Sequence, residues 1–412
     1  MTRSKKLFCL LLLVLSRTPP VGAQQPLYVP GSFEPQDSPW NLTTLYQVPK
    51  TYPTDSCRLQ GFRSFFYEGI TYKAKPARVF AYYKTPPGEP PSGGWPAIIC
   101  VHGGGGTAFP EWVQAWVDHG YAAIAMDLEG HLPKGEFPNR EWFEYAGPPR
   151  ITTFGDIELA DREQWFYQAV ADVIRANSLL RSFPEINKNK IGIHGISWGG
   201  VITCAVIGLD QRLTFAIPVY GCGFLYQTGC PGFKKYFDVM TDTQLKDYKA
   251  KWDPSNYLPV CRIPILSYVG SNDPAFPLDI WQKSMQLTKG RRMLCIPISN
   301  QHGHIWNQKE IFAFADAIVR NGKPLIRIGE AKLLNGIVSI AVSDCPIDKM
   351  LLCFTRDTCD WQHRQWHTIP ATIKEGRVYS VLPEGTIACY FNVTDDRGLV
   401  FSSAYLETKQ EF

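Results

Sequence analysis

Residues 190–200 read Lys-Ile-Gly-Ile-His-Gly-Ile-Ser-Trp-Gly-Gly. The apolar run predicts a buried strand that turns sharply at Ser197 into an apolar helix over residues 201–209. Gly195 and Gly199 carry no side chains, so the strand and the helix can approach each other closely around the serine. A G-x-S-x-G turn between a strand and a helix is typical of a nucleophile elbow. The alternative, a glycine-rich turn with a capping serine, does not explain the motifs that follow.

Alternating strands and helices are expected before and after this elbow in the sequence. The expected order is strand 97–102, helix 111–119, strand 121–127, helix 158–182, the elbow, strands 215–220, 263–270 and 293–299, and a helix that ends near residue 320. Such alternation predicts an α/β fold with a mostly parallel sheet and helices on both faces. Runs at 63–73 and 78–84 predict an antiparallel pair before it. Asn307 and Glu310 predict a capping box for the last helix.

The pattern changes after residue 323. Residues 324–412 contain short alternating runs separated by turns, with no long helix pattern. Several short strands of this kind predict a small all-β domain, an immunoglobulin-like sandwich. The chain of 412 residues is long enough for two domains. We therefore expect a catalytic α/β domain over residues 61–323 and the β-sandwich over 324–412.

The amino terminus has the features of an export signal. Basic residues precede a short apolar run at residues 7–15, and Val-Gly-Ala at 21–23 resembles a cleavage site. We expect a signal peptide over residues 1–23, cleavage after Ala23, and a secreted or periplasmic protein. Residues 24–60 are rich in proline and predict an irregular lead-in. No later apolar run is long enough for a membrane anchor.

The charge of the chain is nearly balanced. The sequence has 42 Lys and Arg against 38 Asp and Glu, a formal net charge of +4. The basic residues of the expected signal account for this excess: Arg3, Lys5, Lys6 and Arg17. A neutral chain offers no electrostatic attraction for nucleic acid or anionic lipid, so neither is an expected partner.

Cysteine pairing is undecided from the sequence. Eleven of the 12 cysteines follow the expected signal, so at least one is unpaired within the chain. Cys100, Cys204 and Cys295 fall in predicted buried elements and are expected to be core thiols. Cys222 and Cys230 bracket a loop and are candidates for a disulfide. Further candidates lie in the carboxyl-terminal part: Cys345, Cys353, Cys359 and Cys389.

A serine nucleophile needs a base and a group that orients the base, and after an elbow these follow in the order acid, then histidine. Asp273 comes directly after the strand at 263–270 and is the preferred acid, with Asp279 as the alternative. The last core strand is followed by Gln-His-Gly-His, residues 301–304. We prefer His302 as the base because it is closer to the strand end, and we keep His304 as the alternative. A metal site at this pair lacks further ligands.

Backbone N–H donors must stabilise the oxyanion that forms when serine attacks a carbonyl. One candidate is Trp198, which follows the nucleophile. The other candidates lie in the loop after strand 97–102, His-Gly-Gly-Gly-Gly, where Gly104 is preferred over Gly103 and Gly105. A phosphate-binding loop is disfavoured because no Gly-Lys-Ser/Thr follows.

Other polar residues have more ordinary explanations. His194 is expected to pack inside the sheet, and Asp127 to be a structural or rim residue at a strand end. Four residues of the carboxyl-terminal part have a spacing that resembles a zinc site: Cys353, Cys359, His363 and His367. Disulfides and surface histidines are commoner in an exported β-domain. No cofactor or metal is expected.

Residues of about 60–322 resemble the α/β-hydrolase superfamily. The stretches IICVHGGGGTAFPEWVQAWVDHGYAAIAMDLEGH, YVGSNDPAFPLD and HGHIWNQKEIFAFADAIVRNGKPL resemble exported acetylxylan esterase-like, dienelactone hydrolase-like and prolyl-oligopeptidase-like serine hydrolases. The resemblance implies a triad of Ser197, Asp273 and one histidine of the pair. It also implies that the carboxyl-terminal segment is an accessory β-domain.

Three functions follow from this pattern. The first is a secreted serine esterase acting on acetyl or other small acyl or methyl esters, with polysaccharide as the expected carrier of these esters. The second is a prolyl-oligopeptidase-like peptidase, although too few residues precede the glycine loop for the large propeller that such enzymes usually carry. The third is a non-catalytic binding protein of the same fold, which the presence of every catalytic part argues against. Residues 222–259 are expected to cover the site.

Overall fold

The structure, a computed structural model, describes residues 38–343 and 345–408. The expected signal peptide and its cleavage site lie outside the described residues. Within those residues, no helix combines the length and the apolar character needed to cross a bilayer.

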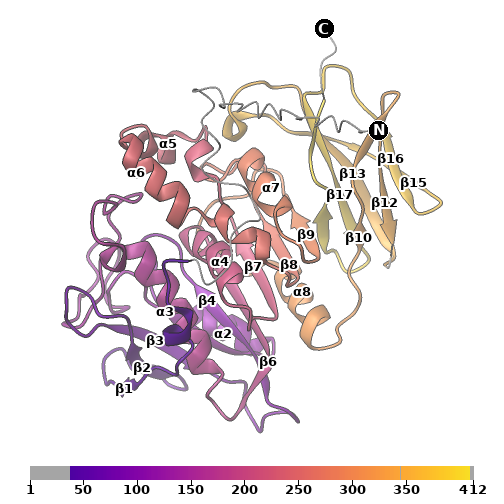
Figure 1. The fold of residues 1–412 in the computed structure, drawn as a ribbon. Helices are drawn as coiled ribbons and strands as arrows, with labels where there is room; N and C mark the ends of the chain where they lie inside the picture. The colour runs from indigo at the N-terminus through magenta and orange to yellow at the C-terminus, as the bar shows by residue number, and fades with distance from the viewer. Residues whose placement is uncertain (1–37, 344, 409–412) are drawn as a thin grey trace, which may run out of the picture.

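A mostly parallel sheet forms the centre of the molecule (Figure 1). It begins with β1 Thr51–Pro53 and has the order β1-β2-β3-β5-β4-β6-β7-β8-β9. The strands from β5 to β9 in this order run parallel to one another. The parallel strands are β4 Trp95–Val101, β5 Ala122–Met126, β6 Ile186–Ile196, β7 Phe215–Val219, β8 Ile265–Tyr268 and β9 Arg292–Cys295. The expected antiparallel pair is present as β2 Arg63–Glu68 and β3 Arg78–Lys84. Residues in β4 and β7 are buried on both faces, as helices on both sides require.

Two helix layers cover the sheet. Helices α2 Pro110–Asp118 and α8 Lys309–Val319 pack together through Trp116 and Phe312. Helices α3 Trp165–Leu180 and α4 Trp198–Leu209 pack on the opposite face.

Strand β6 shows that these are opposite faces. Its residue His194 contacts Trp112 of α2, whereas a Cβ at the next residue, Gly195, would lie 2.2 Å from the hydroxyl of Thr203 in α4. Successive residues of a strand point to opposite faces. The α/β architecture therefore agrees with the alternation seen in the sequence.

Residues 38–60 are more ordered than the expected irregular lead-in. They contain the short helix α1 Leu42–Leu45 and the strand β1 Thr51–Pro53, which pairs with β2. Trp40 is buried and stacks on Tyr167 of α3 at 5.5 Å between ring centroids. Burial of this aromatic ring ties the segment to the domain, and proline content alone does not reveal it.

The predicted capping box at Asn307 and Glu310 is wrong. Helix α8 has Gln308 at its N-cap position, without a side-chain capping bond. The Glu310 carboxylate instead accepts a hydrogen bond from the amide of Val400, 2.9 Å away. Because the Glu310 carboxylate is engaged in this tertiary contact, it does not accept the N-cap amide as a capping box requires.

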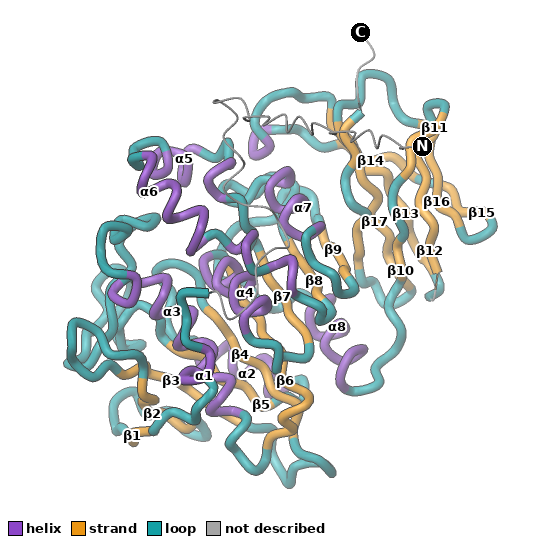
Figure 2. Tube along the Cα trace, in the orientation of Figure 1, coloured by secondary structure: helices purple, strands orange, loops and turns teal. Residues whose placement is uncertain are grey.

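The described part of the carboxyl-terminal region, residues 324–343 and 345–408, is all-β apart from a single 3₁₀ turn at Trp361–His363 (Figure 2). One sheet has the order β18-β17-β13-β14 with β19 beside β17, and the other has the order β10-β12-β16-β15 with β11 beside β12. The strands are β10 Arg327–Ile328, β11 Lys332–Leu334, β12 Ile337–Ser343, β13 Ile347–Thr355, β14 His367–Pro370, β15 Thr372–Lys374, β16 Arg377–Val381, β17 Ala388–Asp395, β18 Val400–Ser402 and β19 Leu406–Glu407. Ser402 of β18 pairs with Leu294 of β9, so the first sheet continues the central one.

The suggested disulfide between Cys222 and Cys230 is absent. Both thiols are buried and free, and the Cys230 thiol donates to the carbonyl of Pro274 instead. Cys353 and Cys389 are also free, although they lie on the paired strands β13 and β17. Cys100, Cys204 and Cys295 are buried core thiols, as expected. Spacing along the chain does not show where a thiol points, which is why the pairings failed.

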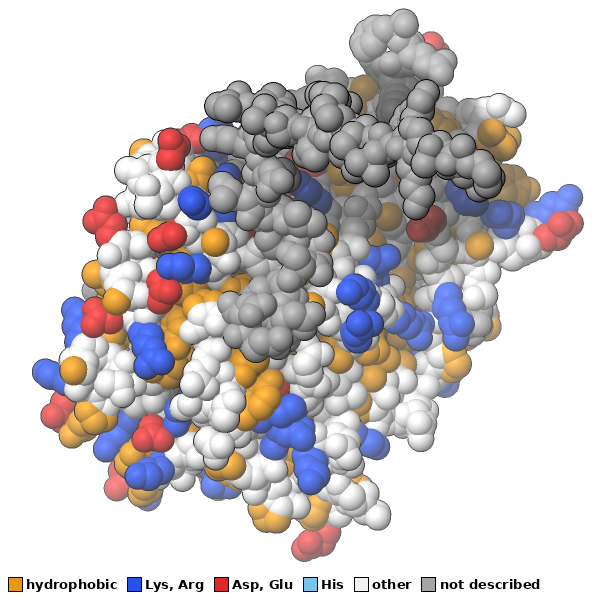
Figure 3. All heavy atoms as spheres, in the orientation of Figure 1, with side chains coloured by type: hydrophobic (Ala, Val, Ile, Leu, Met, Phe, Trp, Pro, Cys, Tyr) orange, Lys and Arg blue, Asp and Glu red, His pale blue; other side chains and the backbone are white. Residues whose placement is uncertain are grey.

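Charged groups of both signs are interspersed over the part of the surface formed by α5 Pro231–Phe237 and α6 Asp242–Asp247 (Figure 3). This distribution agrees with the near balance of acidic and basic residues in the sequence.

Candidate active site

Ser197 lies at the turn between β6 and α4 in a strained backbone conformation. Its φ is 57° and its ψ is −119°, a region that residues with a side chain rarely adopt. A Cβ added to Gly199 would lie 1.9 Å from the carbonyl oxygen of Val101, so the close approach of α4 to β4 requires glycine. The Ser197 amide donates to the carbonyl of Val219 at 2.9 Å, which anchors the turn to β7. The elbow geometry expected from residues 190–200 is therefore present.

His302 connects Ser197 to Asp273. The His302 Nε2 lies 2.9 Å from the Ser197 Oγ, and the His302 Nδ1 lies 2.9 Å from the Asp273 Oδ2. A carboxylate accepts but does not donate, so this contact holds the ring proton on Nδ1 and leaves Nε2 to accept the serine proton. Three segments far apart in the sequence thus meet at the carboxyl edge of the sheet.

Asp273 is held rigidly. Its side chain is fully buried, and its Oδ1 accepts the amides of Ala275 and Phe276 at 2.9 and 2.8 Å. The alternative acid, Asp279, lies in the first turn of α7 Leu278–Gln286 and binds the amide of Ile280. Among the recorded contacts, only Asp273 of these two carboxylates reaches His302.

His304, the alternative base, has a different contact. Its Nε2 accepts the Gly103 amide at 3.0 Å, and its ring lies against Phe109 with centroids 4.9 Å apart. Burial, and then the neighbouring His102, lower the pKa of His304 to about 4. His304 is therefore neutral near pH 7 and keeps the lone pair that accepts the Gly103 proton.

The glycine loop after β4 lies directly beside Ser197. A Cβ added to Gly103 would lie 3.0 Å from the Ser197 Cβ, and one added to Gly104 would lie 2.8 Å from the Trp198 Cδ1. The amides of Gly103 and Gly105 are occupied by His304 and Glu129. Among the hydrogen bonds recorded for residues 38–343 and 345–408, none uses the amides of Gly104 or Trp198. These two are the amides that the sequence favoured as oxyanion donors.

Aromatic rings surround both parts of the site. The Trp198 ring makes edge contacts with rings from three segments: Phe154, Trp165 and Phe233. The His302 ring lies between Tyr220 at 4.7 Å and Phe276 at 6.0 Å, measured between centroids. Phe233 belongs to α5, so the insertion expected to cover the site does contribute a side chain to its surroundings.

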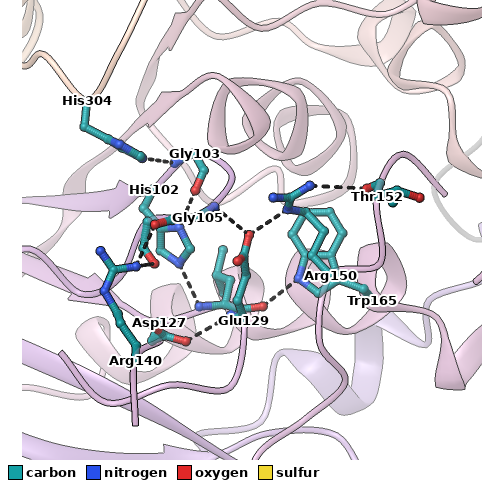
Figure 4. Close-up of polar contacts among 12 residues, drawn as sticks. His102, Gly103, Gly105, Asp127, Glu129, Arg140, Arg150, Thr152, Trp165 and His304 are labelled. Carbon is teal, nitrogen blue, oxygen red and sulfur yellow. Dashed lines mark hydrogen bonds and ion pairs between the residues drawn. The ribbon is translucent and has the colours of Figure 1, made fainter. Parts of the chain in front are cut away.

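Two parts of the site were not expected from the sequence. Glu129, Arg140 and Arg150 lie around the glycine loop (Figure 4). Glu129 is the third residue after the end of β5, and a charged residue in the loop that follows a parallel strand is the signal that could have identified it.

The carboxyl-terminal region also reaches the site. The side-chain amide of Asn272, next to Asp273, donates to three carbonyls in that region: Trp361 at 3.4 Å, Gln362 at 3.3 Å and Arg364 at 2.6 Å. These bonds secure the loop that presents Asp273. They join residues about 90 positions apart, and no local pattern reveals them.

His194 and Asp127 have the structural surroundings expected for them. His194 Nδ1 accepts the indole N–H groups of Trp112 and Trp116 at 3.1 and 3.3 Å. Asp127 is buried, and its Oδ1 accepts the amides of Glu129 and His131. Among the described residues, no three His, Cys, Asp or Glu side chains gather as metal ligands would.

His194 makes the fold sensitive to acid. Burial lowers the pKa of His194 to about 3, far below the ordinary value near 6.5. The unfolded chain therefore binds a proton that the folded chain does not, and stability is lost as the pH falls from about 6.5 toward 3. We expect protonation of His194 in the unfolded chain to lower the free energy of unfolding by about 2 kcal/mol between pH 7 and pH 5.

Urea unfolding of the wild type and of His194→Gln at both pH values measures this effect. Burial raises the pKa of Asp172 to about 7, so protonation of Asp172 stabilises the folded state as the pH falls. Asp172 is present in both proteins, so this contribution cancels when the two are compared. The variant should lose less stability between pH 7 and pH 5 than the wild type. An equal loss in both proteins would show that His194 does not carry the effect.

Two family profiles match parts of the chain. The acetyl xylan esterase (AXE1) family matches residues 61–228, and the prolyl oligopeptidase family matches residues 155–310. The acetyl esterase Axe7A of Xylanibacter ruminicola is 24% identical over 314 residues, which are 70% of this chain and 68% of the relative. The chain is similar to acetyl xylan esterases. Its match to this family supports a carboxylic ester hydrolase.

Solved structures show that this acetyl xylan esterase-like chain has the α/β-hydrolase fold. The acetyl xylan esterase from Paenibacillus sp. R4 has a TM-score of 0.54 at 20% identity, covering 68% of this chain and 92% of that one. Acetyl xylan esterase 1 from Thermoanaerobacterium sp. JW/SL YS485 has a TM-score of 0.50 at 16% identity, covering 69% and 93%. The uncharacterized peptidase YuxL of Bacillus subtilis is 26% identical over 199 residues, but this chain covers only 27% of it.

Proposed function

We propose that the chain hydrolyses acetyl or other small acyl esters on carbohydrate, with Ser197 as nucleophile, His302 as base and Asp273 as the acid that orients His302. The observation that carries the proposal is the unbroken series of contacts from the Ser197 Oγ through His302 to the buried Asp273 carboxylate. The substrate class is suggested by relatives and neighbours described as acetyl esterase and acetyl xylan esterase.

The first half of the reaction forms an acyl-enzyme. The Ser197 Oγ attacks the ester carbonyl carbon while its proton passes to the His302 Nε2. Asp273 stabilises the resulting imidazolium through the Nδ1–H bond. His302 then gives the proton to the departing sugar alkoxide as the C–O bond of the ester breaks.

The second half releases the acid. A water molecule attacks the acyl carbon, its proton passes to His302, and the proton then returns to the Ser197 Oγ as the acyl–serine bond breaks. In both halves the carbonyl oxygen carries negative charge, and the amides of Gly104 and Trp198 are the donors proposed to stabilise it.

A peptidase is the second candidate, and it is the weaker one. The prolyl oligopeptidase profile covers residues 155–310, but the acetyl xylan esterase profile includes the glycine loop and the elbow together. A non-catalytic binding protein is weaker still, because such a protein has no need for the hydrogen-bonded arrangement of Ser197, His302 and Asp273.

A substrate panel separates these candidates. We expect hydrolysis of p-nitrophenyl acetate, release of acetate from acetylated xylan, and no cleavage of Xaa-Pro amides. Methylated pectin distinguishes a methyl esterase from an acyl esterase. Ser197→Ala protein in each assay corrects for hydrolysis by contaminants. Cleavage of the amides without cleavage of the esters would favour the peptidase.

We also propose export and a two-part organisation. The basic and apolar pattern of residues 1–23 supports cleavage after Ala23 and a secreted or periplasmic location. The change from α/β to all-β structure after α8 supports a catalytic domain over residues 61–323 and an accessory domain over 324–412. Two antiparallel sheets in the accessory part support an immunoglobulin-like sandwich as the finer description.

A further inference from the structure

The glycine loop at residues 103–106 poses a physical problem. Glycine has the largest backbone freedom of any residue, and four in succession form an intrinsically flexible segment. An oxyanion donor, by contrast, works only if it already points at the position where the charge develops. Some part of the structure must therefore hold this loop in one conformation.

Besides His102, whose Nδ1 lies 2.7 Å from the Gly103 carbonyl oxygen, three side chains hold the peptide groups of this loop (Figure 4). The His304 Nε2 accepts the Gly103 amide at 3.0 Å, and the Glu129 Oε1 accepts the Gly105 amide at 3.0 Å. Arg140 donates from one nitrogen, Nη1, to the carbonyls of Gly105 at 2.6 Å and Gly106 at 2.7 Å. The loop is thus bound from both sides of Gly104.

Two of these side chains, Glu129 and His304, also have contacts outside the loop. Glu129 is 5% exposed, and its carboxylate forms an ion pair with Arg150 at 2.7 Å. The backbone amide of Glu129 is bound by the buried Asp127, 3.0 Å away. His304 is neutral, so its Nε2 remains an acceptor at the pH where an esterase works. A hydrogen bond inside a protein is electrostatically stronger than one in water, so these buried acceptors hold their partners firmly.

We infer that His304, Glu129 and Arg140 are positioning residues that immobilise the glycine loop and leave the Gly104 amide as its one donor for the substrate oxyanion. The inference rests on the proposed function, because it assigns a role to residues around the same serine. None of the three needs to touch the substrate. Each acts through the loop backbone. His304 thus positions the glycine loop, whereas His302 is the base for Ser197.

The test removes each contact in turn. His304→Phe keeps a ring against Phe109 but loses the acceptor, Glu129→Ala loses the carboxylate, and Arg140→Met keeps the stem but loses the guanidinium. With p-nitrophenyl acetate, each change should lower kcat by roughly 10- to 100-fold, somewhat less than removal of an oxyanion donor itself. KM should change less than about threefold, because the contacts matter in the transition state.

A trifluoromethyl ketone inhibitor provides the second measurement. Addition of the Ser197 Oγ to its carbonyl carbon makes a C–O bond and an oxyanion, while the serine proton passes to His302. Its affinity should fall by the same factor as kcat/KM in each variant, since both depend on the same donor. A role in stability alone would lower the melting temperature without this parallel fall.

Two further variants control the experiment. Glu129→Gln keeps an oxygen that can accept the Gly105 amide and should recover most of the activity that Glu129→Ala loses. Glu141→Gln, at the exposed partner of Lys134 on the same segment, should behave as wild type. If a variant fails to fold, as circular dichroism shows, its conservative replacement is measured instead: Glu129→Gln, His304→Gln or Arg140→Lys.

The outcomes separate the two proposals. An active wild type with unchanged kcat and inhibitor affinity in all three variants would overturn the positioning role alone. A wild type that hydrolyses no ester would overturn the proposed function itself. A parallel fall of kcat/KM and inhibitor affinity supports both.

Discussion

Ser197→Ala protein should have a kcat for p-nitrophenyl acetate roughly 10⁴- to 10⁶-fold below that of the wild type. The reason is that no acyl-enzyme can form without the Oγ, so only the binding and oxyanion contacts remain to accelerate the reaction. KM should change little, because the hydroxyl contributes little to ground-state binding. The unfolding temperature should not fall, since the methyl group fits where the hydroxymethyl was.

Steady-state kinetics with purified protein measures this effect. Ser182→Ala is a matched control, because Ser182 is exposed beyond α3 at the opposite edge of the sheet and should be dispensable. More than about one per cent of wild-type kcat in folded Ser197→Ala, with no contaminating esterase, would show that the nucleophile lies elsewhere.

The two histidines should differ strongly when each is replaced. His302→Ala should lower kcat by roughly 10⁴-fold or more, since the base and its link to Asp273 are lost together. His304→Phe should lower kcat by roughly 100-fold at most, because it disturbs only the position of a donor. The difference follows from contacts: His302 reaches the Ser197 Oγ, and His304 reaches the Gly103 amide.

The measurement is kcat/KM of both variants on one substrate over a range of pH, with exposed His363→Ala as a control. Near-complete loss in His304→Phe, with a substantially active His302→Ala, would reverse the assignment.

Features encoded locally were predictable from the sequence. The strand, turn and helix around Ser197 depend on glycines and apolar residues within a few positions, and the structure places them as expected. The positions of Asp273 and His302 follow from a general property of parallel sheets, in which strand ends meet at one edge. Proximity to the strand end also favoured His302 over His304, and the structure brings His302 to Ser197.

Features that depend on tertiary contacts were not predictable. The capping box failed because Glu310 binds Val400, and the suggested disulfide failed because Cys230 turns toward Pro274. The bonds from Asn272 to the carboxyl-terminal region join distant segments through backbone carbonyls, which every residue possesses. Sequence spacing carries no information about such partners.

The most direct test of the account is covalent labelling with a fluorophosphonate, followed by mass spectrometry of peptides. Attack on phosphorus forms an O–P bond and releases fluoride, and it requires both a nucleophilic serine and its base. We predict one adduct, on Ser197 in the wild type, and nearly none in His302→Ala. A label on another residue, or an active esterase that takes no label at Ser197, would contradict the account.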